Sequence, residues 1–200
     1  MQRIVLASGN KGKLKELNSI LNSEALELIP QSVFNVTEVA ETGLSFVENA
    51  LIKARHACFK TGLPSIADDS GLEVDALEGA PGIYSARYAE ITGPKADAEN
   101  NIKLLQELKD VPQLERTARF QCVIVYLRHA KDPMPLVSQG SWEGQILFAE
   151  EGRNGFGYDP LFYVPTHSCS SAELDPHTKN NLSHRRKALN QLSLCLKSRL

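Results

Sequence analysis

The sequence lacks the features that mark several common classes of protein. Its four cysteines form no CxxC pair, and no group of histidines and cysteines has zinc-site spacing. The apolar run near the start, residues 4–7, is too short for a signal peptide, and no run approaches the ~20 apolar residues of a membrane-spanning helix. A net charge of −2 provides no basic field for nucleic acid. We therefore expect a cytoplasmic protein that binds neither membranes nor nucleic acids and whose cysteines are small core residues.

The composition is sufficient for one substantial core. The chain has 200 residues, of which 42% are hydrophobic, and a chain of this size buries roughly 70% of its unfolded surface. The sequence shows no internal repeats, low-complexity tracts or long linkers. We therefore expect a single domain over residues 1–200, in which two lobes around a cleft are compatible with the length.

Hydrophobic periodicity predicts helices alternating with strands in the first part of the chain and clustered strands later. The best-marked helix covers residues 46–61, with a capping box formed by Ser45 and Glu48 and a stop at Gly62. Other helices are expected after residue 13, near 97–109 and after Ser183. Strands are expected at 4–7, 65–67, 72–74, 120–127 and 161–164, and a hairpin at 137–147. The pattern predicts an α/β protein with a mixed sheet.

The first segment that could carry chemistry is the loop Ser8–Lys13, between a strand and a helix. Its glycines let backbone N–H groups approach an anion, the following helix N-terminus adds partial positive charge, and Lys11 and Lys13 add full charges. The loop resembles a phosphate cradle but has no Walker A spacing, because only two residues separate Gly9 from Gly12. The alternative interpretation is a solvated turn with ordinary surface lysines.

The second segment is Asp68–Gly71, which follows a short apolar strand. Adjacent acids at a strand end repel each other and favour a compensating cation. Magnesium prefers carboxylate oxygens and often bridges protein carboxylates to substrate phosphates. A carboxylate there could instead polarise an attacking water. Glu41 is a candidate for a further metal-site acid. The alternatives are an exposed polar turn or helix cap for the pair and a surface glutamate for Glu41.

Two later segments could bind a nucleoside. Gly155 and Gly157 flank Phe156, so its ring could stack on a base; the alternative is a turn whose aromatic ring packs into the core. Lys179 and the segment 183–186 are basic, and cations at a helix N-terminus are unfavourable unless they meet an anionic or oxygen-rich partner. The alternative interpretation of Lys179 and residues 183–186 is a basic solvated face.

Taken together and in this order, these segments resemble the inosine triphosphatase-like (RdgB) family of non-standard purine nucleoside-triphosphate pyrophosphatases. The matching segments span nearly the whole chain. They are residues 6–13, 41–43, 48–50 with 53–54, 67–72, 79–88, 155–160 and 183–185. Ser8 stands where many relatives have threonine, and serine retains the hydroxyl group. The residues around Lys179 match the family weakly.

The resemblance implies a two-lobed α/β fold with a long twisted mixed β-sheet, flanking helices and a central cleft. It also implies a homodimer, a requirement for Mg2+, and cleavage of dITP, ITP or XTP to the monophosphate and pyrophosphate. Asp69 would be the general base and a metal residue, with Glu41 and Asp68 supporting the metal. Substrate would be bound by Ser8, Gly9, Asn10, Lys11, Gly12, Lys13, Lys53, Ser70, Phe156, Gly157, Tyr158, Asp159, Lys179, His184 and Arg185.

Two other functions are compatible with the residues alone. One is a phosphotransferase or γ-phosphate-cleaving NTPase that uses the glycine–lysine loop and releases orthophosphate; the missing Walker spacing opposes it. The other is a nucleotide sensor that binds ITP without turnover. The paired acids oppose this second alternative, because binding alone gains little from them.

Overall fold

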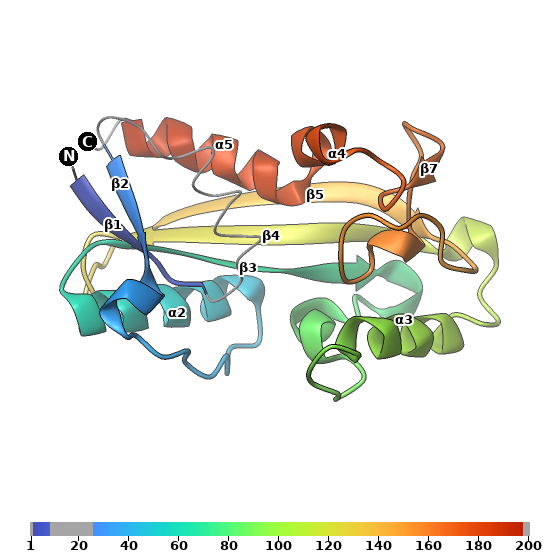
Figure 1. The fold of residues 1–200 in the computed structure, drawn as a ribbon, viewed down its shortest axis with the longest axis horizontal. Coiled ribbons are helices and arrows are strands. Elements are labelled where there is room, and N and C mark those ends of the chain that lie inside the picture. The colour runs from blue at the N-terminus through green and yellow to red at the C-terminus, as the bar shows by residue number, and fades with distance from the viewer. Residues whose placement is uncertain (1, 9–25, 198–200) are drawn as a thin grey trace. The chain divides into compact units, whose positions relative to one another are not determined.

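The computed structural model describes residues 2–8 and 26–197 (Figure 1). Most of the glycine–lysine loop, residues 9–13, and the helix predicted after it lie outside this part of the chain. None of the helices in the described ranges combines the length and the hydrophobicity that crossing a bilayer requires.

A mixed seven-stranded sheet runs through the described residues. Its strands follow the order β2-β1-β3-β4-β5-β6-β7. β1 pairs in parallel with β2 and β3, whereas β6 pairs antiparallel with both β5 and β7. The strands are β1 Gln2–Leu6, β2 Leu26–Pro30, β3 Ser65–Val74, β4 Thr117–Leu127, β5 Leu136–Ile146, β6 Phe162–Val164 and β7 Cys169–Ser170. The predicted α/β fold with a mixed sheet is confirmed.

Helices accompany the sheet, and the best-marked one is confirmed with its predicted bounds. In α2 the Ser45 hydroxyl accepts from the N–H of Glu48, and Gly62 ends the helix with a φ of 69°. The α-helices are α2 Phe46–Thr61, α3 Ala96–Glu107, α4 Pro176–Leu182 and α5 His184–Lys197. Short 3-10 helices are η1 Gln31–Phe34, η2 Asp75–Leu77, η3 Gly82–Arg87, η4 Gln113–Glu115 and η5 Asp159–Leu161.

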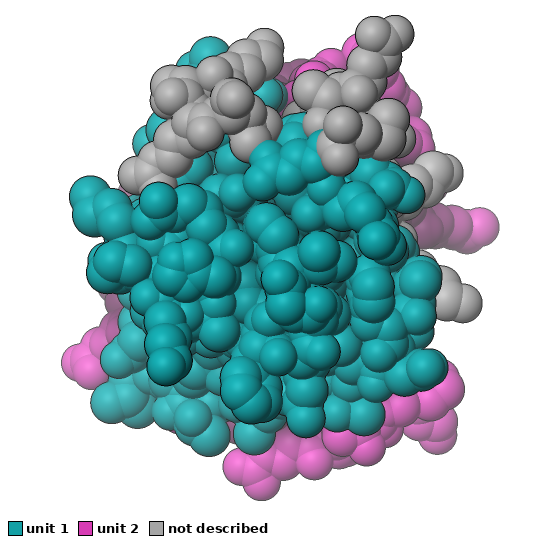
Figure 2. All heavy atoms as spheres, turned by 90° about the vertical axis from the view of Figure 1, so that its left-hand side faces the viewer, with its two compact units in different colours: residues 1–69, 122–140, 187–200 teal, residues 70–121, 141–186 magenta. Residues whose placement is uncertain are grey.

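The chain divides into two compact units. Unit 1 holds residues 1–69, 122–140 and 187–200, and unit 2 holds residues 70–121 and 141–186 (Figure 2). The boundary therefore falls within the strands β3, β4 and β5. That the whole chain acts as one pyrophosphatase domain stays a prediction.

Unit 1 buries apolar residues on both faces of its strands. On one face Ile4, Ile66 and Ile124 pack with leucines of α5. On the other, Val5, Ala67 and Val125 pack with the alanine stripe of α2. Because successive strand residues point to opposite faces, the two helices cover opposite sides, which explains why residues 120–127 are apolar almost throughout.

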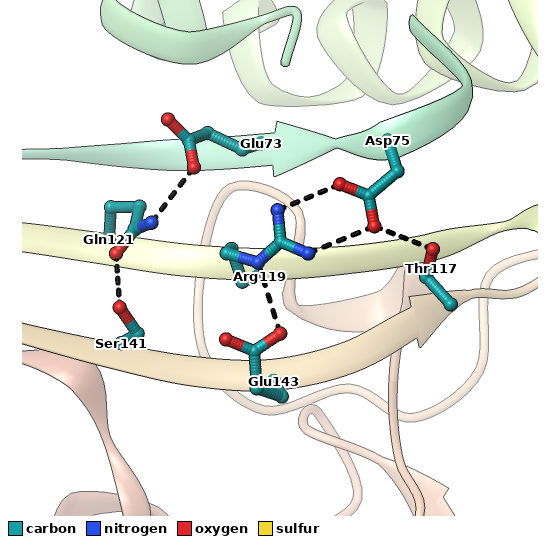
Figure 3. Close-up of polar contacts among 7 residues, drawn as sticks. All are labelled: Glu73, Asp75, Thr117, Arg119, Gln121, Ser141 and Glu143. Atoms are coloured by element: carbon teal, nitrogen blue, oxygen red, sulfur yellow. Dashed lines mark hydrogen bonds and ion pairs between the residues drawn. The ribbon is translucent and has the colours of Figure 1, made fainter. Parts of the chain in front are cut away.

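Unit 2 has one apolar and one polar strand face. Leu72, Val74, Ala118 and Trp142 lie in its core, whereas the alternate positions carry a network of hydrogen bonds and ion pairs (Figure 3). In this network the Arg119 guanidinium contacts Asp75 at 2.8 Å and Glu143 at 3.0 Å. Its members are Glu73, Asp75, Thr117, Arg119, Gln121, Ser141 and Glu143. The polar face is thus tied together by its own side chains.

Two predictions along the sheet are wrong. Residues 65–74 form one continuous strand, whereas separate strands were expected at 65–67 and 72–74. Residues 137–147 form no hairpin, because β5 runs unbroken through both of its glycines. A Cβ at Gly144 would lie 2.5 Å from both the Phe162 ring and the Tyr163 carbonyl oxygen, so this glycine allows close packing of β6 and makes no turn. The strands β2 and β7 and the helix α4 were not predicted.

Candidate active site

The two adjacent acids lie inside β3 and are buried. Asp68 is 2% exposed and Asp69 is 7% exposed, so the alternative of an exposed polar turn or helix cap is wrong. Alternation along a strand places the two carboxylates on opposite faces of the sheet. Asp69 shares its face with Ala67 and α2, and Asp68 shares the other face with Ile66. The acids therefore act from different sides of the strand instead of forming a single pair.

Lys53, on α2, joins two of the predicted acids. Its Nζ lies 2.7 Å from Glu41 Oε1 and 2.9 Å from Asp69 Oδ1. Burial lowers the pKa of Lys53 most strongly of the single causes, but the charges of Asp69 and Asp68 and the hydrogen bonds to Glu41 and Asp69 together raise it above its usual value. Lys53 is thus a cation at neutral pH, and it fixes Glu41 beside Asp69.

A buried amide that the sequence did not single out completes this group. Asn49 is fully buried on α2, and its Nδ2 donates to Asp69 Oδ2 at 3.3 Å. It lies one helical turn before Lys53, so both side chains project from the same face of α2. That spacing, together with a polar residue inside the alanine stripe, is the sequence signal that could have identified it.

The donors around Asp69 suit a magnesium ion that is held jointly by the protein and a bound substrate. Within residues 2–8 and 26–197, no three or more His, Cys, Asp or Glu side chains converge closely enough to hold a metal ion themselves. Magnesium, however, is usually held by one or two carboxylates together with substrate phosphates and water. Glu41 and Asp69 both contact Lys53, and the charge of Asp68 also acts on this lysine; all three acids offer hard oxygen donors. This donor set fits the predicted cation.

In unit 2 the loop around Phe156 presents an aromatic ring to solvent. Gly155 and Gly157 have positive φ angles of 82° and 60°, which glycine adopts without strain. The Phe156 ring is 55% exposed, so the alternative in which it packs into the core is wrong. Lys179 Nζ lies 5.3 Å from the centre of the ring, close enough for a cation–π contact.

The other residues of this loop are engaged within the protein. Asp159 is 4% exposed; one carboxylate oxygen accepts from the Phe156 N–H and from Lys179, and the other accepts from Ser171. The Tyr158 hydroxyl is buried and donates to the carbonyl of Ser85, and burial raises its pKa. Asp159 therefore fixes the position of Phe156 and Lys179, and Tyr158 anchors the loop to the core.

The basic pair at the start of α5 is largely buried. Ser183 accepts from the Arg186 N–H at 3.1 Å, which confirms the predicted cap and places His184 and Arg185 in the first turn. The His184 ring stacks on Phe120 with centroids 5.1 Å apart. Arg185 Nη2 contacts the hydroxyl of Ser70 at 3.4 Å. The alternative of a basic solvated face is wrong for this pair, since both side chains are at most 9% exposed.

The predicted residues thus fall into two groups. Unit 1 brings together Glu41, Lys53 and Asp69, with Asp68 on the opposite strand face. Unit 2 brings Phe156 together with Lys179, and Ser70 together with Arg185. Ser8 follows β1 and is half-buried, whereas Gly9, Asn10, Lys11, Gly12 and Lys13 lie outside the described residues. The roles of all these residues stay predictions.

Comparison with known proteins identifies the family. The model of the Ham1 family matches residues 4–194. The chain belongs to the Ham1 family. The chain is 61% identical to the dITP/XTP pyrophosphatase of Vibrio parahaemolyticus over 193 residues, 96% of this chain and 95% of the relative. It is 62% identical to the dITP/XTP pyrophosphatase of Shewanella oneidensis, covering 96% of this chain and 92% of the relative.

Solved Ham1 structures have the same fold. A HAM1 protein from Coxiella burnetii matches with a TM-score of 0.93 at 50% identity, covering 99% of this chain and 100% of that one. The Staphylococcus aureus Ham1 protein matches with a TM-score of 0.88 at 40% identity and covers both chains fully. The family relationship predicted from the scattered sequence motifs is therefore confirmed over nearly the whole chain.

Proposed function

We propose that this protein hydrolyses the non-standard purine nucleoside triphosphates dITP, ITP and XTP to the monophosphate and pyrophosphate. In this role it would clear deaminated purines from the nucleotide pool before they enter DNA or RNA. The observation that carries the proposal is the match of about the full chain, at 61% identity, to a protein named dITP/XTP pyrophosphatase. The two groups of side chains would supply the chemistry that such a reaction needs.

In unit 1 we assign the reaction itself to Asp69. Its carboxylate would accept a proton from the water that attacks the α-phosphate, as general bases do. Lys53 balances the charge of Asp69 and Glu41 and would lie near the phosphates. Asp69 and Glu41 would hold Mg2+, which when bound supplies charge neutralisation for the phosphate chain, and Asp68, on the opposite strand face, would support the metal site through its charge. Ser8 and the residues that follow it to Lys13 would bind the triphosphate through backbone amides and lysines.

In unit 2 we assign recognition of the base. The exposed ring of Phe156 would stack on the purine, with Lys179 beside it, and Ser70 would contact the substrate. His184 and Arg185 would donate to the carbonyl at position 6 of hypoxanthine or xanthine. Adenine carries an amino group there, so the same donors would be left unmatched, which discriminates strongly between bases.

The proposal also includes a homodimer, which rests on the family resemblance, and a cytoplasmic location, which rests on the absence of a predicted signal peptide or membrane span in the sequence. Sedimentation of the purified protein tests the first: a species of twice the 22.0 kDa chain mass is expected, and a monomer at every concentration would contradict it.

A turnover panel tests the proposed reaction. ITP, dITP, XTP, ATP and GTP are each incubated with the protein and Mg2+, and pyrophosphate and orthophosphate are measured separately. We expect pyrophosphate from the first three, little product from ATP, and no product when Mg2+ is chelated. Orthophosphate in place of pyrophosphate would indicate cleavage at the γ-phosphate. Binding of ITP with no product would indicate a sensor, and either result would overturn the proposal.

A further inference from the structure

The amide of Asn49 is held in one orientation inside unit 1. The side chain is fully buried, and both of its polar atoms have partners. Its Oδ1 accepts from the Gly43 N–H at 2.9 Å, and its Nδ2 donates to Asp69 Oδ2 at 3.3 Å. Exchanging the amide oxygen and nitrogen would place two donors together at Gly43 and two acceptors together at Asp69, so only the observed orientation of the amide gives both hydrogen bonds.

The two oxygens of the Asp69 carboxylate are fixed by different residues of the same helix. Oδ1 contacts Lys53 Nζ at 2.9 Å, and Oδ2 accepts from Asn49. A single contact would leave the carboxylate free to rotate about its last bond. Contacts to both oxygens, from two residues one turn apart on a rigid helix, set the plane of the carboxylate as well as its position.

Both helix residues also reach the same neighbouring segment. Lys53 contacts the side chain of Glu41, and Asn49 contacts the backbone of Gly43. A Cβ on Gly43 would lie 2.9 Å from Asn49 Oδ1 and 2.5 Å from the Glu48 Cβ, so only glycine lets the segment approach this closely. Asn49 therefore links the backbone beside Glu41 to the carboxylate of Asp69.

We propose that Asn49 is a positioning residue for Asp69: it touches no substrate and acts by orienting the carboxylate that accepts the proton from water. The inference rests on the proposed function, in which Asp69 is the general base. A misplacement of a reacting group by about 1 Å can cost 10²-fold in rate. The contact should therefore affect turnover much more than substrate binding.

The first experiment replaces Asn49 by leucine, which has a similar branched shape but neither hydrogen bond. For N49L we expect kcat for ITP to fall about 10- to 100-fold, while KM changes less than about threefold. Asn100 provides a matched control on α3. It is 2% exposed, and its amide accepts from Ala89 N–H and donates to the Ser85 carbonyl, with no carboxylate among these partners.

The control separates positioning from loss of stability. N100L removes two hydrogen bonds from a buried helical asparagine, as N49L does, so the two variants should lose similar thermal stability. Only N49L should lose turnover, whereas N100L should keep kcat within about threefold of the original protein. Equal losses of kcat in both variants, or an N49L protein with undiminished kcat, would overturn the inference.

A double-mutant cycle tests whether Asn49 acts through Asp69. If it does, adding N49L to D69N should lower kcat by less than about threefold, because the group that Asn49 orients has already been lost. If Asn49 serves only the general fold, N49L should cost the same factor in both backgrounds. An additive cycle would therefore overturn the inference even if N49L alone were slow.

N49D provides a second variant should N49L fail to fold. It keeps the shape of the side chain and an acceptor for the Gly43 N–H, but replaces the donor with a carboxylate oxygen that faces Asp69. At pH 8 we expect a loss of kcat at least as large as for N49L, and N100D is its control. An N49D protein with unchanged kcat would contradict the assignment.

Amide hydrogen exchange supplies a measurement that needs neither metal nor turnover. In N49L the Gly43 amide should exchange faster than in the original protein, whereas in D69N it should stay protected. If the original protein released no pyrophosphate from any nucleotide, the proposed function would fail, and unchanged Gly43 protection in N49L would separately overturn the Asn49 contact. An active original protein with an additive cycle would overturn only the inference.

Discussion

The contacts of Lys53 predict how much stability the folded chain loses when this residue is replaced. Replacing it by methionine keeps most of the aliphatic stem but removes the cation that joins Glu41 and Asp69 at 2.7 and 2.9 Å. The carboxylates then remain beside each other, and Asp69 stays buried without the charge of Lys53. K53M should consequently destabilise the folded chain even in the absence of nucleotide.

The burial of the Lys53 and Glu41 side chains sets bounds on the free energy of unfolding that K53M loses. Breaking a buried ion pair by removing one partner costs about 3–5 kcal/mol. The Lys53 and Glu41 side chains are 16% and 27% exposed, so solvent screens part of the interaction and we expect about 3 kcal/mol, the lower end of that range. For a chain of this size, this corresponds to a fall of about 6–12 °C in Tm.

The pH dependence has a definite sign. The folded pKa of Lys53 is raised above its usual 10.5, so its stabilising contribution is complete below that value and is lost as the pH rises through the folded pKa. The difference between K53M and the original protein should therefore be constant through neutral pH and shrink above pH 10.5.

Urea unfolding at pH 7, followed by circular dichroism, measures the effect directly. Lys60 is exposed near the end of the same helix, and K60M serves as the control that should change stability little. A K53M protein within about 0.5 kcal/mol of the original, the range typical of surface substitutions, would refute the argument. A K60M loss equal to that of K53M would refute it as well.

Three further predictions concern other parts of the chain. In F156A the KM for ITP should rise more than kcat falls, because stacking binds the base without entering the chemical step; an unchanged KM in steady-state assays would remove the ring from substrate binding. R119M should lower stability at pH 7. The loss should shrink below pH 3.8, because hydrogen bonds from Arg119 and Thr117 lower the pKa of Asp75 and this stabilisation disappears as Asp75 is protonated. Urea titrations at pH 7 and below pH 3.8 test this, and a stability difference from the original protein that widens in acid would contradict it. G62A should cost about 1 kcal/mol, since φ is 69° and a Cβ there meets nothing within 4 Å; equal unfolding midpoints would contradict a purely backbone penalty.

The sequence predicted local structure best where several short-range signals coincide. The helix α2 has a capping residue, an alanine stripe and a glycine stop within one segment, and its bounds are confirmed. The strand β5 shows the opposite case. Gly144 suggested a turn, but its missing side chain serves close packing against Phe162 and Tyr163, which are remote in sequence.

The site shows the same limit. Charged residues and an aromatic residue between two glycines attract notice in a sequence, and Glu41, Lys53 and Asp69 do come together. The role of Asp159 within the loop could not be read from the motif, because its burial depends on Ser171 and Lys179, which follow it by 12 and 20 residues. Asn49 was missed although its polar side chain interrupts the alanine stripe, because its partner Asp69 lies on a strand 20 residues away in the sequence.

The measurement that tests the central claim most directly is the single-turnover rate of pyrophosphate release by D69N with saturating ITP and Mg2+. The substitution keeps the shape of the side chain and removes its ability to accept a proton from water. We predict a rate about 10²–10⁴-fold below that of the original protein, with ITP still bound. A D69N protein that released pyrophosphate at nearly the original rate would show that this carboxylate does not activate the water.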